Sequence, residues 1–471
     1  MRFHQTWLGT LSLLTSLSTP TLANQDPDTL ENANHIFNAI QSTLRHHGSE
    51  VNYNGMSFYR ASVPKGTKFY HGTGLKDPIQ GLEWLAFKPE HSLGFAHRSG
   101  NKFFAKKDLQ QPINEYTESE WDGHGYLHTY AAAKDLRLLY IDGMSAGPGG
   151  GAESQDRILY NNTINGDRPV GGPKIGGPPQ EQQRAIEACR MAKEDWNDKI
   201  DGIVRTEGDF EIILCNFERD LEVVHITQTK PQENSGRPGG PGGPGGPGGR
   251  KGRKGGHGPG GPGGPGGPFK GPRSGLKYWS LATRFDERLG EKVQVDLNNF
   301  VSAYTYGLDL FPDNASVPQV GHIPVEELQP IRQDVYKMID TWDTPIDTFD
   351  WQAIADMIVF QYSDELKSLA AGTFSSTKEL RDHLEGLLEP FIDYRDFNDG
   401  EVIIDRCARE WIPSSAPVGS LGGNAVFSVA RSVCSTLVSA LMDDEQDLET
   451  SVAKFNDLVG YLQWTTWAGD E

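Results

Sequence analysis

Residues 235–274 read SGRPGGPGGPGGPGGRKGRKGGHGPGGPGGPGGPFKGPRS, and this stretch decides how the rest of the chain is organised. Of its 40 residues 20 are Gly and 9 are Pro, and its one aromatic residue is Phe269. Gly-Gly-Pro triplets favour extended, solvated backbone and supply no core. A Gly at every third position also fits collagen, but the runs are short and are broken at residues 250–254. We therefore predict a disordered Gly/Pro-rich basic linker over 234–275, with a separately folded region on each side.

The first 23 residues have the pattern of a secretory signal peptide. A short apolar run from Leu8 to Leu17 follows a basic start, and Thr21-Leu22-Ala23 has the small-x-small pattern of a cleavage site. No later run is long enough to span a bilayer. We therefore expect a soluble, secreted, extracellular protein, in which the sequons at Asn161 and Asn314 are candidate glycosylation sites.

Four cysteines are divided evenly about the linker. Cys189 and Cys215 precede it, and Cys407 and Cys434 follow it. An even number in an oxidising compartment predicts one structural disulfide on each side, although sequence alone leaves the connectivity open. The absence of any Cys-x-x-Cys argues against zinc binding or redox chemistry.

The charge is distributed unevenly along the chain. The net charge is −20, yet the linker carries seven basic residues and no acidic one, so the remainder sums to −27. An acidic surface repels nucleic acid and anionic lipid, which excludes both as expected partners. The basic linker could hold a polyanion or the protein's own acidic regions, and a solvated spacer is the simpler interpretation.

Residues 24–233 have the pattern of an α+β domain. A helix with one apolar side is predicted over 29–45, and further helices over 90–98 and 180–196. Between them lie short apolar runs bounded by Gly, Pro and Asp, which are typical of strands. The predicted strands are 68–71, 83–87, 126–130, 136–141, 202–205, 210–217 and 221–226.

Residues 276–471 have the pattern of an all-α helical bundle. Short extended pieces are predicted at 293–297 and 301–308, and helices from residue 325 onward. The clearest helix covers 351–370, with Asp347 or Thr348 as its cap and an apolar face that includes Trp351, Ile358 and Leu366. The other predicted helices are 325–342, 377–391, 401–411, 425–441 and 447–462.

Three stretches of the N-terminal region carry candidate chemistry. One strand ends in His71-Gly72-Thr73, where Gly would let a ligand approach the backbone. An apolar strand through Phe87 then turns into a helix at Pro89. Glu211 lies at the head of a late apolar strand, and Glu207 competes with it for the same role.

This order of motifs resembles the layout of the ADP-ribosyltransferase superfamily. The resemblance implies that His71, with Gly72 and Thr73, holds NAD as a substrate and that Phe87 stacks on nicotinamide. It also implies that Glu211 stabilises the oxocarbenium-like centre, a role that suits a carboxylate fixed on a rigid strand. The sequence departs from the family at Leu85-Ala86-Phe87, where a Ser-Thr-Ser motif or a Tyr is expected.

Two other kinds of site have weaker patterns. His124-x-x-x-His128 would chelate a metal on a helix, but the stretch is predicted to be a strand, so no metal site is expected. Gly143-Met144-Ser145-Ala146-Gly147 fits the Gly-x-Ser-x-Gly pattern of hydrolases. The residues that follow are Pro and Gly, which cannot form the helix that a nucleophile elbow needs.

Taken whole, the chain is similar to a family of secreted two-domain proteins of filamentous fungi, a resemblance that implies no particular activity. It rests on residues 83–91, 125–130, 138–147, 201–205, 210–215, 350–352 and 356–359. Two functions are therefore expected from different classes. One is NAD glycohydrolysis or ADP-ribosyl transfer by the N-terminal region. The alternative is a non-catalytic secreted binding, effector or pathway-accessory protein.

Overall fold

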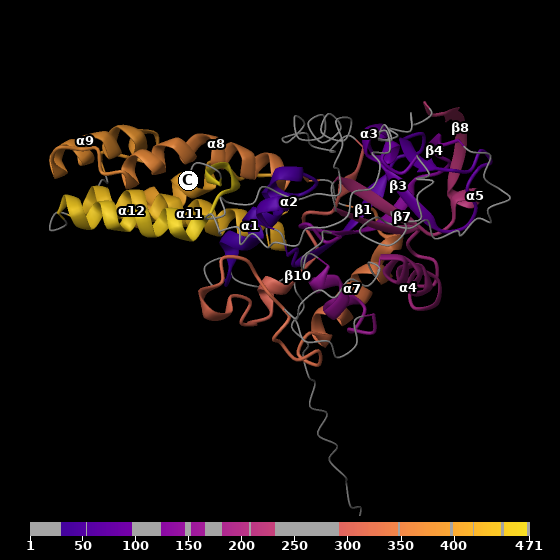
Figure 1. Ribbon diagram of the computed structural model, residues 1–471. Coiled ribbons are helices and arrows are strands. Elements are labelled where there is room, and N and C mark those ends of the chain that lie inside the picture. The colour runs from indigo at the N-terminus through magenta and orange to yellow at the C-terminus, as the bar shows by residue number, and fades with distance from the viewer. Residues whose placement is uncertain are drawn as a thin grey trace, which may run out of the picture.

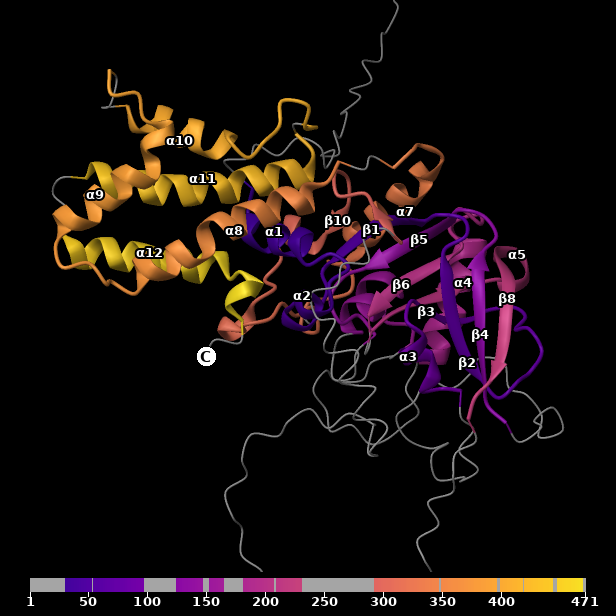
Figure 2. The ribbon, with the colours of Figure 1, turned by 90° about the horizontal axis from the view of Figure 1, so that it is seen from above.

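The computed structural model describes residues 30–52, 54–96, 124–146, 152–164, 181–206, 209–230, 292–346, 349–395, 399–417, 419–443 and 447–468. Within them, a mixed β-sheet with flanking helices lies beside a bundle of long helices (Figure 1, Figure 2). The predicted mixed α/β region and helical region are confirmed in this form. The expected leader (1–23) and linker (234–275) lie outside the described residues.

Ten strands of the described residues form one sheet, in the order β10-β1-β5-β6-β7-β3-β2-β4-β8, with β9 also pairing with β1. The β5–β6 pair is parallel, and the other pairs are antiparallel. Their bounds are β1 Ser57–Val63, β2 Lys68–Thr73, β3 Glu83–Ala86, β4 Tyr126–Ala132, β5 Leu136–Ile141, β6 Gly202–Thr206, β7 Phe210–Leu214, β8 Leu221–Gln228, β9 Gln294–Val295 and β10 Val301–Ser302.

The sequence predicts seven of these strands in the N-terminal region and misses β1. The missed strand contains Arg60, a residue that looks polar in the sequence but is buried against Asp296 at 2.6 Å. The predicted strand 210–217 is too long, because Asn216 caps a short helix, α5 (Phe217–Asp220), by accepting a hydrogen bond from the amide of Arg219. The other apolar runs correspond to strands that the structure contains.

The helical region follows the predicted pattern closely. Most of its helices begin at a side chain that accepts a hydrogen bond from the third helical amide, the arrangement that stabilises an N-terminus. For α8 this residue is Asp350, which corrects the predicted cap at Asp347 or Thr348. The helices are α7 Gln329–Asp340, α8 Trp351–Ala370, α9 Thr377–Leu388, α10 Gly400–Arg409, α11 Leu421–Met442 and α12 Leu448–Leu462.

The two sides of the linker do not form separate cores, which corrects the expectation that each side folds by itself. The strands β9 and β10 follow the linker and pair with β1. In the opposite direction, α1 (Ala33–Gln41) packs against α8 and α11. The side-chain amides of Asn34 and Asn38 donate to the carbonyls of Tyr461 and Leu462 at the end of α12. Each side therefore supplies elements that complete the other.

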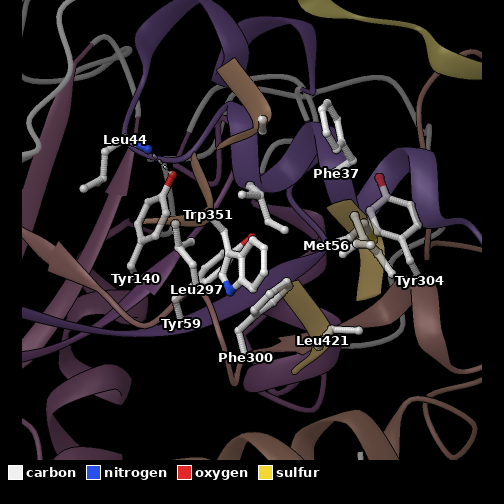
Figure 3. Packing of buried hydrophobic residues seen from close by; sticks show 14 of the residues in the cluster. Phe37, Leu44, Met56, Tyr59, Tyr140, Leu297, Phe300, Tyr304, Trp351 and Leu421 are labelled. Atoms are coloured by element: carbon white, nitrogen blue, oxygen red, sulfur yellow. Dashed lines mark hydrogen bonds between the residues drawn. The ribbon is translucent and has the colours of Figure 1, made fainter. Parts of the chain in front are cut away.

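Trp351 lies where these contributions meet (Figure 3). It is 1% exposed, and its indole nitrogen donates to Asn298 at 2.5 Å. The surrounding residues come from α1, from the sheet, from the segment after the linker and from α11; the labelled ones are Phe37, Leu44, Met56, Tyr59, Tyr140, Leu297, Phe300, Tyr304 and Leu421. A single contiguous core thus spans both regions.

The helix α11 is both long and apolar. An 18-residue window within its 22 residues has a mean hydropathy of 1.6, so by length and composition it could span a membrane, contrary to the expectation that no later run is long enough. Just over half of that window, 56%, is buried inside the protein. Its packing against α1, α8, α9, α10 and α12 accounts for this composition.

Two disulfides form, one on each side of the linker. Cys189 bonds to Cys215, with their Cα atoms 5.3 Å apart, and Cys407 bonds to Cys434, with their Cα atoms 6.0 Å apart. The first bond ties α4 (Glu181–Glu194) to the residue after β7, and the second ties α10 to α11. The predicted pairing is confirmed, and it adds no covalent link between the two sides.

The shared core predicts that the two sides stay together after the linker is cut. A specific protease site inserted near residue 250 should allow complete cleavage, yet the fragments should elute together in size-exclusion chromatography. Residues 24–233 expressed alone should lack a cooperative thermal transition, because β1 and α1 lose their partners. Fragments that elute separately and fold independently would contradict the shared core.

Candidate functional site

His71 is buried inside the sheet region. It is 7% exposed, and its Nδ1 lies 2.8 Å from the carbonyl oxygen of Trp84. That contact makes Nδ1–H the donor and leaves Nε2 as an acceptor with no hydrogen-bond partner among the described residues. Burial lowers the pKa of His71 to about 4, so the ring is neutral at ordinary pH.

The neighbouring residues of the predicted NAD site serve packing. A Cβ at Gly72 would meet the carbonyl oxygen of Ser92 at 1.9 Å, so the absent side chain makes room for α3 (Pro89–Leu93) and the turn after it. Thr73 is 1% exposed, and its hydroxyl accepts from the amide of Leu75. Phe87 is also 1% exposed and packs edge-on against Phe69 at 5.2 Å. All three residues are thus packed within the protein.

Glu211 is neutralised by its cross-strand neighbour. It is 1% exposed, and the Nε of Arg205 donates to its carboxylate at 2.9 Å. Arg205 is fully buried and also pairs with Glu181 at the start of α4. Glu207, the competing residue, lies outside the described residues.

Strand register places His71 and Glu211 on opposite faces of the sheet. Tyr70 is directly opposite Ala86 across the β2–β3 pair, and Ala86 is opposite Glu211 across β3–β7. Directly paired residues share a face, whereas consecutive residues alternate. His71 therefore points away from the face of Glu211. The two residues proposed to share an NAD site do not meet.

The face of Glu211 is covered by α4 through a chain of buried ion pairs. Arg184 on α4 donates to both carboxylate oxygens of Asp156, at 2.7 and 2.6 Å, and also pairs with Glu181. Glu181 in turn pairs with Arg205, which completes the connection to Glu211. Because isolated buried charges are costly, such a chain fixes the position of α4 on the sheet.

The face of His71 holds a second polar group, built around His128 and Tyr130 on β4. The Nε2 of His128 lies 2.8 Å from the carbonyl oxygen of Leu75, and its Nδ1 lies 3.0 Å from the hydroxyl of Tyr130. That hydroxyl accepts from the amide of Ile79 at 3.0 Å. The tautomer of His128 with its proton on Nε2 satisfies all three contacts, because Nδ1 can then accept from the Tyr130 hydroxyl. These side chains therefore tie the loop after β2 to β4.

The alternative sites of the sequence are also packed. Ser145 is fully buried and donates to the carbonyl oxygen of Ile141 at 3.0 Å, as in a closed turn. Among the residues that the structure describes, no group of three or more His, Cys, Asp and Glu side chains could hold a metal. Asn161 is exposed in a turn, and Asn314 lies in a short helical turn, Pro312–Asn314; glycosylation at both stays a prediction.

An open groove lies at the junction of the two regions, where the sequence analysis found no site. Its volume is about 360 Å³, and its walls come from the end of α1, from α2 (His46–Val51), from α8 and from Thr465 and Thr466. Phe360 on α8 lines the groove and is 88% exposed. The sequence did carry one sign of this groove, because Phe360 lies off the apolar face predicted for this helix, on the side that faces solvent.

The comparisons with known proteins point to uncharacterised relatives. The family model described as the YPL277C N-terminal domain matches residues 26–118 and 104–237. Two Saccharomyces cerevisiae proteins are similar over 44% of this chain: uncharacterized protein YOR389W, 31% identical, and uncharacterized protein YPL277C, 30% identical. The matches cover 35% and 46% of those proteins' lengths. No solved structure matches.

These matches support an uncharacterised family for the N-terminal region. They lend no support to the likeness to ADP-ribosyltransferases or to secreted filamentous-fungal proteins, which stay predictions. The family match ends at residue 237, inside the Gly/Pro-rich segment. Because the relatives are covered over less than half of their lengths, they assign no activity to the whole chain.

The ion-pair chain predicts a specific stability defect. Glu211→Gln leaves Arg205 with one carboxylate fewer in a fully buried position, so the free energy of unfolding should fall by about 3 kcal/mol. Urea denaturation measures this change, and Glu222→Gln, at an exposed position of β8, is the matched control. A loss below about 0.5 kcal/mol would contradict a structural role for the pair.

Buried neutral histidines predict an acid-sensitive fold. The pKa of His71 is lowered to about 4 by burial, below its unfolded value of about 6.5, so its contribution to stability is present above pH 6.5 and is lost as the pH falls toward 4. Burial lowers the pKa of His35 to about 4 as well, and that of His128 in the same direction. Burial raises the pKa of Asp142 to about 7. Its contribution to stability therefore falls as the pH rises toward 7, in the opposite direction to that of the histidines.

Comparing the wild type with His71→Asn isolates the contribution of His71 to this pH dependence of stability. His71→Asn keeps a donor near the position of Nδ1 but does not titrate. Its unfolding free energy should depend less steeply on pH between 4 and 6.5, by up to about 1.4 kcal/mol per pH unit. Urea denaturation across this range measures both slopes. Equal slopes would show that His71 is not held neutral by the fold.

Proposed function

We propose that the protein is a secreted binding protein that does not turn over NAD. The single observation that carries this proposal is the strand register, by which His71 and Glu211 lie on opposite faces of one sheet. Catalysis of nicotinamide release needs a carboxylate beside the reacting sugar carbon and a pocket that admits the dinucleotide. Each of the two side chains is instead surrounded by its own packed neighbours.

The electrostatics of Glu211 support the same proposal. A carboxylate that stabilises a developing cation must face the substrate without a permanent counter-ion in its place. Here the guanidinium of Arg205, fully buried, already occupies that role at 2.9 Å. A ligand cation would have to displace an internal ion pair, at a cost of several kcal/mol.

Secretion is part of the proposal and rests on two kinds of feature. The sequence of the first 23 residues has the pattern of a leader, and the protein forms two disulfides. Disulfides persist in oxidising compartments and are rare in the cytosol. An accessible groove with an exposed aromatic side chain then offers a binding surface on an extracellular protein.

NAD consumption by the full-length protein tests the proposal. Proton NMR of NAD with micromolar protein should show no nicotinamide release above the buffer rate over several hours. Glu211→Gln, measured at a temperature where it stays folded, should give the same trace as the wild type. Steady nicotinamide release by the wild type that is lost in Glu211→Gln would overturn the binding proposal in favour of the enzyme.

A further inference from the structure

We propose that the junction groove binds a neutral carbohydrate, with Phe360 as the stacking surface. This inference rests on the proposed binding function and names its site and ligand class. The groove is the space of about 360 Å³ bounded by α8, by residues 41–48 and by Thr465 and Thr466. Its chemistry combines an exposed aromatic ring, an ion pair and an exposed hydroxyl group.

The ion pair of Arg45 and Asp356 contributes no net charge to the groove. The two terminal nitrogens of Arg45 donate to the two carboxylate oxygens of Asp356, at 2.7 and 2.5 Å. Their side chains are 21% and 34% exposed, so the pair is partly open to the groove. Each terminal nitrogen keeps a second N–H, and each carboxylate oxygen keeps a second lone pair. A ligand at this pair would meet donors and acceptors side by side, as adjacent sugar hydroxyls require.

The hydroxyl of Thr466 extends this polar wall. Ser42 at the end of α1, Ser363 on α8, and Thr465 and Thr466 in the C-terminal segment all line the groove. Ser42 and Thr465 are buried, and their hydroxyls are bonded to Asn52 and Gln41, whereas Thr466 is exposed. An exposed hydroxyl both donates and accepts, so it matches a polyhydroxylated neutral ligand better than a phosphate or a carboxylate. Arg45, the arginine that lines the groove, is already paired with Asp356, which disfavours an anionic ligand.

Phe360 supplies the apolar part of the site. The ring is 88% exposed and has Val359 beside it in the groove lining. An exposed aromatic ring on a rigid helix gains free energy when a ligand covers its face. The C–H face of a pyranose ring is apolar while its edge carries hydroxyls, so one sugar unit can stack on Phe360 and reach the polar wall.

The groove runs along one face of α8, from Asp356 through Val359 and Phe360 to Ser363, which indicates an extended ligand. Small ligands are mostly enclosed on binding, whereas this groove is open. An oligosaccharide can lie along such a surface with only one or two units in close contact. The shared core fixes both walls, because α1 and α8 pack directly against each other.

Isothermal titration of the full-length protein with three neutral hexasaccharides tests this inference. Laminarihexaose, N-acetylchitohexaose and mannohexaose are suitable probes because they differ in linkage and substituents. At least one should bind, and Phe360→Ala should weaken that binding by about tenfold, since the stacking partner is lost. The variant should fold normally because the side chain is exposed.

The matched control removes an exposed aromatic side chain elsewhere. Tyr394 is 58% exposed in the segment between α9 and α10, and it does not line the groove. Tyr394→Ala should bind the sugar as the wild type does. Failure of all three sugars to bind at millimolar concentration would overturn the inference, as would binding that Phe360→Ala leaves unchanged. Either result would leave the absence of NAD turnover standing, because that is measured separately.

Discussion

The pairing of β1 with strands from both sides of the linker is the constraint on which the rest of the structure depends. One edge of β1 pairs with β5, and the other edge pairs with β9 and β10. On that second edge the hydroxyl of Ser57 donates a hydrogen bond to the hydroxyl of Ser302, 245 residues away in the sequence. Arg60, in the middle of this strand, is buried against Asp296. A strand fixed in this way holds the sheet, the helical region and the groove between them in one arrangement.

Buried charge in the sheet region serves this architecture. The chain from Asp156 through Arg184, Glu181 and Arg205 to Glu211 attaches α4 to one face, and the disulfide from Cys189 to Cys215 strengthens the same contact. On the other face, His128 and Tyr130 hold a loop. Titratable residues in a buried strand therefore indicate a site only when they share a face and an opening.

Local patterns in the sequence predict most of the elements but not their register. The helix 351–370 and the strand 136–141 are predicted with their observed bounds, because each has a clear apolar period and a clear end signal. The faces of His71 and Glu211 depend on which residues pair across β2, β3 and β7, and a shift of one residue would reverse either of them. No feature within a single strand determines that pairing.

The same limit explains why the groove and the shared core could not be predicted. Both depend on contacts between segments far apart in the chain, such as Arg45 with Asp356 and Asn38 with Leu462. The Gly/Pro-rich segment indicated two independent folds, since composition describes a linker and not what its flanking segments contact. An exposed phenylalanine on a helix surface is visible in the sequence only after the buried face is known.

Hydrogen exchange under increasing urea tests the central claim, that both sides of the linker form one cooperative core. The claim predicts that peptides from β1 and from α11 lose protection at the same urea concentration, because neither can open without the other. Loss of protection in β1 at a clearly lower urea concentration, with α11 still protected, would contradict it.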